Sequence, residues 1–580
     1  MPSRNVSRWP RRRVRWILSL GLAALLVGLL PHSRAERPNE PPYFAIRNAR
    51  LVPVSGPVIE NGTIVLAKGL ITAIGTDVPI PPEAWVIDGK GLTVYPGLID
   101  ALTTLGLPAP AAAAAAPTTL EQAVQQMRRQ PISRGPEDRP GTTPWENAAD
   151  NLKTDDKRLE NWHKAGFTTA VTVPDKGIFP GQAALINLAG ERPRDLVVKT
   201  PVALRVNLTP VGGFRNFPGS LMGVFAYVKQ VFLDADHYAQ AWSLYEAQPR
   251  GRERPAYDRA LEPIRDAVAN RTPVLIPATW AKEIHRAIRF GEEVGANTLL
   301  YGAHQGYALA AVLAAKKLPV LVNLKWPEKP KDADPDAVEP LRVLRFRDRA
   351  PSTPAALQQA GVKFAFYSGG LANPRDILKN ARKMIAAGLP AAAALRAFTL
   401  SAAEIYGVGD RLGSLEAGKI ANLAVTDGDL FAEKTKVKMV FIDGRKYAIR
   451  EPGRPPAPPT VDLTGTWMLR VETPRGVRES TAELTMEEDG TLSGTSTGRR
   501  GTTSITSGWV SGNKFSFTLT FTMGPRTMEA TYTGTVEANR MSGTVSIGRM
   551  TSEFTGTRPE GRLGAQSLAI QVGTALGGRQ

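Results

Sequence analysis

Short runs of alternating apolar and polar residues fill the segment 43–95. The dipeptides Asn61-Gly62 and Asp88-Gly89 separate these runs. Alternation with a period of two predicts half-buried β-strands, and dipeptides of this kind favour tight turns between them. A similar pattern returns at 407–450. We therefore predict one composite β-sandwich, to which the two segments contribute strands from either side of a long intervening region.

The intervening region, residues 96–406, alternates apolar strand-like runs with helical stretches. Eight strand candidates lie at 97–101, 168–174, 183–189, 202–208, 273–278, 298–303, 319–324 and 363–369. Strands that alternate with helices predict a parallel sheet, and eight such units suit a (β/α)8, TIM-like barrel of the α/β class. Residues 107–160 form an alanine-rich, charged insertion after the first strand. We expect a surface excursion there, with a functional lid as the alternative.

The chain changes composition after a proline-rich stretch at 451–460, which predicts a stiff linker. Residues 461–558 are rich in Thr, Gly and Ser, and their apolar residues alternate strictly. In "KFSFTLTFTM", one face carries Phe515, Phe517, Leu519, Phe521 and Met523. This pattern predicts a small antiparallel β-barrel or sandwich, and the module resembles small calycin-like barrels. The tail 559–580 is predicted to be flexible.

The first 35 residues have the layout of a secretory signal peptide. Six arginines lie between positions 4 and 15, an apolar run extends from Trp16 to Leu30, and a small-x-small cleavage site ends at Ala35. An uncleaved anchor is the alternative, but a membrane span needs about 20 apolar residues. We expect no stable membrane span after cleavage and an exported, periplasmic or secreted protein. The arginine pairs leave Sec and twin-arginine export open.

Charge and cysteine content narrow the function classes. The net charge is +18, and residues 1–35 supply seven arginines and no acid, so the processed chain would carry 18 − 7 = +11. The remaining basic residues are scattered, without a stripe interleaved with aromatic residues, so we expect no nucleic-acid partner. The chain has no cysteine. This excludes disulfides, thiolate metal sites and a cysteine nucleophile.

Three stretches resemble the amidohydrolase superfamily, in particular its imidazolonepropionase-like branch. "YPGLIDALTTLG" (95–106) is similar to the family's first barrel strand, and "GVKFAFYSGG" (361–370) is similar to its eighth. Residues 393–425 resemble the closing helix and the return to the β-sandwich. The resemblance covers nearly all of 43–450. It implies a TIM-like barrel whose family members hydrolyse non-peptide C–N bonds with water activated by a divalent metal such as zinc.

This sequence departs from the family at the positions that the resemblance assigns to metal ligands. The family uses a histidine pair on strand one, a histidine on each of strands five and six, and an aspartate on strand eight. Here these positions hold Leu102 and Thr104, Pro277, Tyr301 or Gly302, and Gly369. Zinc sites use imidazole, carboxylate or thiolate donors, which none of these residues supplies. We therefore predict no familiar metal site and no cofactor.

A relocated or metal-free site is the remaining route to catalysis. Four residues are weak catalytic candidates because they lie near predicted strand ends: Asp100, Thr104, His304 and Lys325. Other polar residues predicted to face the barrel mouth are Thr103, Asp175, Arg205, Asn207, Asn323 and Ser368. We expect His163, His237 and His285 to be ordinary helix residues. A glycine-rich turn with Arg215 and Ser220 is a weaker candidate for an anion site at a helix N-terminus.

Three hypotheses for function follow. The first is a degenerate amidohydrolase that has lost metal-dependent catalysis and acts as a binding or scaffold protein, with a small molecule as its expected ligand. The second is an active hydrolase of C–N bonds with an unrecognised site. The third is an interaction protein that works through its C-terminal β module. Fold alone does not choose among them, because function depends on the site. The oligomeric state is left open.

Overall fold

The computed structural model describes most of the chain from Tyr43 to Arg558. The described residues are 43–108, 133–211, 216–329, 334, 338–371, 373–449, 458–473, 476–487, 490–498, 501–523, 526–547 and 550–558. Four predictions lie wholly or largely outside these residues: the signal peptide 1–35, the alanine-rich part of the insertion, the linker and the tail 559–580. Arg215 also lies outside them. Within the described part, we find no helix of the length and hydropathy that a membrane span requires.

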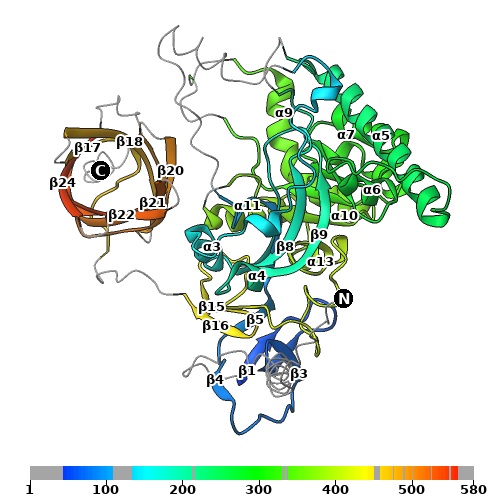
Figure 1. The fold of residues 1–580 in the computed structure, drawn as a ribbon. Coiled ribbons are helices and arrows are strands. Elements are labelled where there is room, and N and C mark those ends of the chain that lie inside the picture. Colours follow the sequence, from blue (N-terminus) through cyan, green and yellow to red (C-terminus); the bar gives the residue numbers. More distant parts are fainter. Residues whose placement is uncertain are drawn as a thin grey trace, which may run out of the picture. The chain divides into compact units, whose positions relative to one another are not determined.

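Both predicted sheet segments contribute to one eight-stranded sheet (Figure 1). Its strand order is β16-β15-β14-β5-β1-β2-β3, with β4 paired to β1. The segments join where β14 pairs with β5, and Leu423 lies opposite Pro96. One connected sheet therefore includes strands from both sides of the central region, while its sandwich form stays a prediction. The strands are β1 (Tyr43–Leu51), β2 (Ile59–Ala67), β3 (Leu70–Gly75), β4 (Trp85–Asp88), β5 (Thr93–Pro96), β14 (Leu423–Thr426), β15 (Val437–Ile442) and β16 (Arg445–Ala448).

All eight strands predicted for the central region are present, and they follow one another around a sheet ordered from β6 to β13. They are β6 (Leu98–Thr103), β7 (Phe167–Thr172), β8 (Gly181–Asn187), β9 (Val197–Arg205), β10 (Val274–Ala278), β11 (Thr298–Gly302), β12 (Val320–Asn323) and β13 (Phe364–Tyr367). Along each strand, successive side chains alternate between two sides. One set forms an apolar cluster in the barrel interior, and the other packs against the surrounding helices.

The prediction of a fully parallel sheet is wrong for one strand, because β8 runs antiparallel to both β7 and β9. Residues 173–180, which connect β7 to β8, are too few for a crossover: parallel neighbours need a connection of about a dozen residues or more. The domain is therefore a TIM-like barrel with one reversed strand. In Figure 1, helices α5, α6 and α7 lie on the outer side of β8 and β9.

The helices of the described region are mostly short. They are α3 (Lys157–His163), α4 (Pro193–Leu196), α5 (Leu221–Ala247), α6 (Glu262–Val268), α7 (Ala281–Glu293), α8 (Ala310–Ala315), α9 (Leu341–Arg349), α10 (Thr353–Gln359), α11 (Pro374–Ala386), α12 (Ala391–Phe398) and α13 (Leu400–Ile405). At the start of α5, the Ser220 hydroxyl accepts a hydrogen bond from the Gly223 backbone (3.1 Å). Ser220 is thus an N-cap, as its residue type favours.

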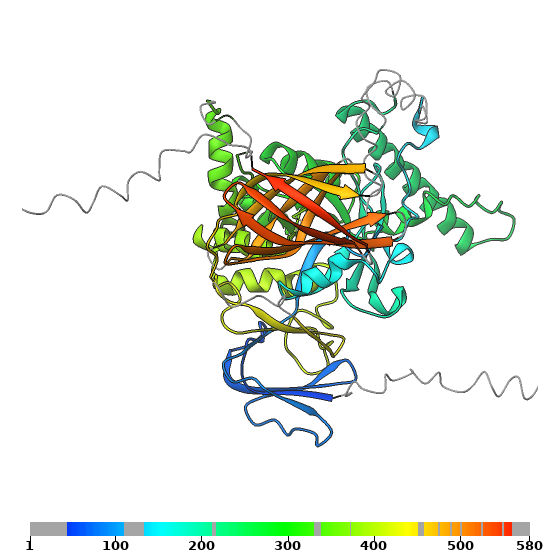
Figure 2. The same cartoon turned by 90° about the vertical axis from the view of Figure 1, so that its left-hand side faces the viewer.

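The C-terminal module is a closed barrel of eight antiparallel strands, seen along its axis in Figure 1 and from the side in Figure 2. Its strands are β17 (Gly465–Thr473), β18 (Gly476–Met486), β19 (Leu492–Gly498), β20 (Gly501–Ser511), β21 (Lys514–Met523), β22 (Arg526–Glu537), β23 (Arg540–Ile547) and β24 (Met550–Thr557). The predicted all-β module is confirmed, and Phe515 and Phe517 are buried as the alternation requires. Its likeness to calycins stays a prediction.

Candidate active site

The C-terminal ends of the parallel barrel strands form the mouth where enzymes of this architecture carry their active sites. The predicted ligand position on strand one holds Leu102, which is 5% exposed. Leu102 belongs to the apolar cluster of the barrel interior, together with Tyr301 and Tyr367 from β11 and β13. The β6–β7 ladder is irregular between Asp100 and Thr103. Aliphatic packing therefore occupies the place of the first histidine.

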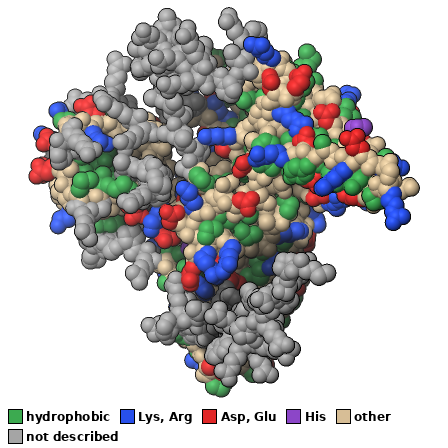
Figure 3. Space-filling model, in the orientation of Figure 1, with side chains coloured by type: hydrophobic (Ala, Val, Ile, Leu, Met, Phe, Trp, Pro, Cys, Tyr) green, Lys and Arg blue, Asp and Glu red, His purple; other side chains and the backbone are tan. Residues whose placement is uncertain are grey.

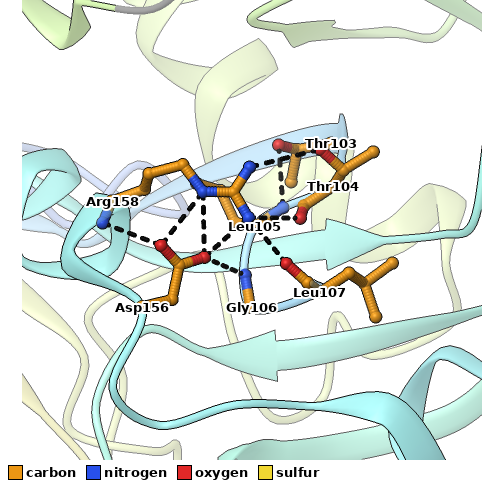
Figure 4. A network of polar contacts seen from close by, with 7 residues as sticks. All are labelled: Thr103, Thr104, Leu105, Gly106, Leu107, Asp156 and Arg158. Carbon is orange, nitrogen blue, oxygen red and sulfur yellow. Dashed lines mark hydrogen bonds and ion pairs between the residues drawn. The ribbon is translucent and has the colours of Figure 1, made fainter. Parts of the chain in front are cut away.

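Thr104 lies in a loop that is fastened to the start of α3 (Figure 4). The guanidinium of Arg158 donates to the carbonyl oxygens of Thr104 (3.0 Å) and Leu107 (2.9 Å). The Asp156 carboxylate accepts from the Gly106 backbone (2.9 Å) and from the Arg158 side chain (2.7 Å), and it also caps α3. The Thr104 hydroxyl itself is only at the limit of hydrogen bonding, 3.5 Å from Arg158. These contacts fix the loop through its backbone.

The carboxyl group of Asp100 is buried beside the seam between β6 and β13. Its Oδ1 accepts a hydrogen bond from the backbone of Ser368 (3.0 Å), and its Oδ2 accepts from the indole of Trp162 (3.1 Å). Asp100 is 1% exposed, and burial raises its pKa to about 6. Because both oxygens are bonded to the protein, Asp100 joins strand ends and α3 and is not presented to a substrate.

The remaining predicted ligand positions are equally unsuited to a metal. Pro277 on β10 lies opposite Tyr301 on β11. The Tyr301 hydroxyl donates to the side-chain oxygen of Asn207 (3.0 Å). Gly369 has a φ of +61°, and a Cβ added there would lie 1.8 Å from Oδ1 of Asn323. An aspartate at position 369 therefore has no room unless Asn323 moves.

The residues present do not fit the divalent metal that the family uses. Such a metal needs several imidazole or carboxylate donors at about 2.0–2.2 Å, with one open position for water. Leu102, Pro277 and Gly369 provide no side-chain donor, and Asn323 would have to shift before position 369 could hold one. In the part of the chain that the structure describes, no three His, Asp or Glu side chains lie close enough together to hold an ion.

His304 and Lys325 do not converge on a common point. The His304 ring bonds the carbonyl oxygen of Asn323 through Nε2 (2.9 Å) and packs against Trp326 and Phe346. A carbonyl oxygen only accepts, so Nε2 carries the hydrogen. Burial lowers the pKa of His304, which keeps the ring neutral. The Lys325 side chain is exposed, while its backbone N–H donates to Asn323 Oδ1 (2.7 Å). His304 thus connects β11 to β12.

A polar cluster at the mouth unites residues that the sequence suggested only one at a time. The Arg205 Nε donates to Asn207 Oδ1 (3.1 Å), and its Nη1 donates to the carbonyl oxygen of Pro174 (3.4 Å). The guanidinium carbon lies 5.4 Å from the centre of the Tyr301 ring. The alternation in "VALRVNL" puts Arg205 and Asn207 on one strand face. Sequence reasoning did not connect them to Tyr301, which lies two strands away.

Comparison with known proteins gives a family domain and a shared fold. Residues 281–446 match the model of the amidohydrolase family. An amidohydrolase from Thermotoga maritima MSB8 superposes with a TM-score of 0.58 and 24% identity, over 70% of this chain and 100% of that chain. An adenosine deaminase from Xanthomonas campestris with bound zinc gives a TM-score of 0.38 and 19% identity, over 71% and 94%. The first shares the fold; the second is too distant to add to this. No curated protein matches the chain.

Proposed function

We propose that this chain, which carries an amidohydrolase-family domain over residues 281–446, is a degenerate relative that binds a small molecule and has lost metal-dependent hydrolysis. One observation carries the proposal: the ligand positions lack donors or the space for them. Leu102 packs in the apolar interior, Pro277 has no donor, and a side chain at Gly369 collides with Asn323. Ancestry in a hydrolase family does not supply catalysis when the site lacks it.

The loss of the metal also removes the water that the family's reaction needs. A bound divalent ion lowers the pKa of its water to about 7 and so provides hydroxide at neutral pH. Asp100 is the candidate that could replace it as a base, because its pKa is raised to about 6. Its oxygens, however, are held by Ser368 and Trp162, and the side chain is buried. This arrangement favours a binding or scaffold role over hydrolysis of C–N bonds.

The proposal has three further parts that follow from the sequence. The chain belongs to the imidazolonepropionase-like branch, on the strength of its first-strand, eighth-strand and closing motifs. It is exported to the periplasm or secreted, because residues 1–35 have the layout of a signal peptide. The C-terminal barrel is an accessory module of calycin-like form. Its interior is filled by aromatic rings, including Trp467, Phe515 and Tyr532, which favours a structural or docking role over enclosure of a ligand.

Metal analysis combined with an activity assay tests the proposal. The chain lacking residues 1–35 is dialysed against zinc, desalted and analysed by inductively coupled plasma mass spectrometry. It is then assayed on a panel of amides and other C–N substrates with and without a chelator. We expect far less than one equivalent of metal and no chelator-sensitive hydrolysis. About one equivalent of zinc or iron, together with activity that the chelator abolishes, contradicts the proposal.

A further inference from the structure

We infer that Arg205, Asn207 and Tyr301 form a receptor for the carboxylate group of a small molecule at the barrel mouth. This inference rests on the proposed binding function and names the ligand class for that same site. Arg205 supplies the positive charge, Asn207 orients it, and the Tyr301 ring supports its face. None of the three supplies the imidazole or carboxylate donor that the family uses for its metal, so the proposed site depends on this chain's own residues.

The backbone holds Arg205 at a fixed place. Arg205 is the last residue of β9 and has ladder partners on both sides, Gly181 on β8 and Leu275 on β10. Ala203, two residues earlier, lies in the apolar cluster of the barrel interior. Because side chains alternate along a strand, Arg205 points to the same interior side, at the level of the mouth. Arg205 is partly exposed, so part of its side chain is accessible to solvent.

The side chain is oriented but its charge is not neutralised. Within the described residues, its contacts are the Asn207 amide oxygen, the Pro174 carbonyl oxygen, and the ring and hydroxyl of Tyr301. None of these is a carboxylate. Arg139, another partly buried arginine, pairs with Asp258 at 2.6 Å, whereas Arg558 in the C-terminal barrel resembles Arg205 in its amide, carbonyl and ring contacts. A partly buried cation without an anionic partner is poorly compensated, and an incoming anion restores the balance.

The donors left over match a carboxylate. The two hydrogen bonds use Nε and one hydrogen of Nη1. Of the five N–H donors of a guanidinium, these bonds leave Nη2 and one hydrogen of Nη1, and such donors can bind the oxygens of a carboxylate. Asn207 cannot rotate away, because its Oδ1 also accepts from Tyr301 and its Nδ2 donates to the carbonyl oxygens of Asp175 (2.8 Å) and Gly177 (2.9 Å). The guanidinium is therefore bonded to a partner that is itself held in place.

Charge count favours a carboxylate over a phosphate. Arg205 is the single cation among the three residues of the cluster. Lys176, in the loop that holds Asn207, has an exposed side chain, and Lys325 lies beyond β12, three strands along the sheet from β9. One guanidinium balances one negative charge, whereas a phosphate dianion calls for further cations. Figure 3 shows acidic and basic side chains interspersed over the face that it presents. The proposed recognition depends on the short-range contacts of Arg205.

Calorimetric titration of the chain lacking residues 1–35 tests this inference. The probes are benzoate, acetate and inorganic phosphate at matched ionic strength. The variants are Arg205→Met, which removes the charge, and Arg205→Lys, which keeps the charge and removes the planar edge. Arg252→Met is the control, because Arg252 is exposed in the loop after α5 and its loss changes the net charge equally. Circular dichroism is used to check that each variant folds. If Arg205→Met does not fold, Arg205→Lys still tests the inference.

We expect benzoate to bind the parent chain and the Arg252→Met variant equally. Both Arg205 variants should bind it at least about tenfold more weakly. Undetectable binding at millimolar benzoate and acetate, unchanged affinity in the Arg205 variants, or tighter binding of phosphate would each overturn the inference. Zinc analysis of the same preparation separates the two claims. A metal-loaded hydrolase refutes the proposed function, whereas a metal-free chain that ignores carboxylates refutes only the receptor.

Discussion

The side chain of Asp100 accepts a hydrogen bond from the backbone N–H of Ser368 across the seam where the first and last barrel strands meet. Among the described strands, no ladder pairs β6 with β13, although the two lie in contact. A buried carboxylate thus makes a connection between strand ends that backbone pairing does not make. Its second oxygen holds Trp162 of α3, so one side chain joins two strands and a helix.

Replacing Asp100 by alanine should destabilise the barrel strongly. Two donors, the Ser368 N–H and the Trp162 indole N–H, would lose their acceptor in a buried site, at about 1–3 kcal/mol each. We expect the free energy of unfolding of the barrel to fall by about 2–5 kcal/mol in urea titrations. Asp175→Ala is the control because Asp175 is exposed. Equal stability of the Asp100 variant and the parent chain would show that the seam does not depend on this residue.

The stability of the parent chain should fall as the pH rises through the range in which Asp100 ionises. Burial raises the pKa of Asp100 from 3.8 to about 6, so the folded state holds this proton where the unfolded state has released it. The unfolded state then gains stability relative to the folded state as pH rises between these values. A shift of about 2 pKa units corresponds to about 3 kcal/mol lost between pH 4 and pH 7.

Asp100→Asn provides the reference for this pH dependence. The amide stays neutral at every pH and keeps an acceptor oxygen for Ser368, although its NH2 group faces the Trp162 donor. That mismatch costs the same at every pH. The difference in unfolding free energy between the parent chain and Asp100→Asn should therefore change by about 3 kcal/mol across this range. If the unfolding free energies of the two proteins change in parallel with pH, the raised pKa of Asp100 in the folded state is contradicted.

The apolar runs of the sequence were sufficient to locate every barrel strand, but the direction of β8 was missed. Strand direction depends on the connection, and the eight residues 173–180 allow a hairpin but not a crossover. The length of this gap was visible in the sequence. The contact of Arg205 with Tyr301 was not, because β10 lies between their strands and the side chains meet across the barrel interior. Local patterns do not specify such contacts.

The loop after β6 should depend on Arg158 and not on the hydroxyl of Thr104. Arg158 donates to two carbonyl oxygens of the loop, whereas its contact with the Thr104 hydroxyl is 3.5 Å long. Arg158→Met should lower the free energy of unfolding by about 1–3 kcal/mol. Thr104→Val should change it by less than about 0.5 kcal/mol. A large effect of Thr104→Val on ligand binding, with stability unchanged, would reinstate Thr104 as a site residue.

Gly369 and Asn323 should show strong energetic coupling, because a Cβ at 369 would lie 1.8 Å from Asn323 Oδ1. Gly369→Ala incurs both this overlap and the strain of a φ of +61°, and we expect a loss of about 2–4 kcal/mol. Gly370→Ala is the matched control. Its φ is +84°, but the space around it is open, so only backbone strain of about 1 kcal/mol should appear.

In an Asn323→Ala background the overlap disappears, and the cost of Gly369→Ala should approach that of Gly370→Ala. Asn323→Ala has a cost of its own, because Oδ1 accepts a hydrogen bond from the Lys325 backbone. The double-mutant cycle removes this cost, and we expect a coupling energy of about 1–3 kcal/mol. If the free-energy changes of the two substitutions are additive, the Asn323 side chain moves aside at little cost. An aspartate could then be accommodated at position 369, and the steric part of the case against a metal ligand there would fail.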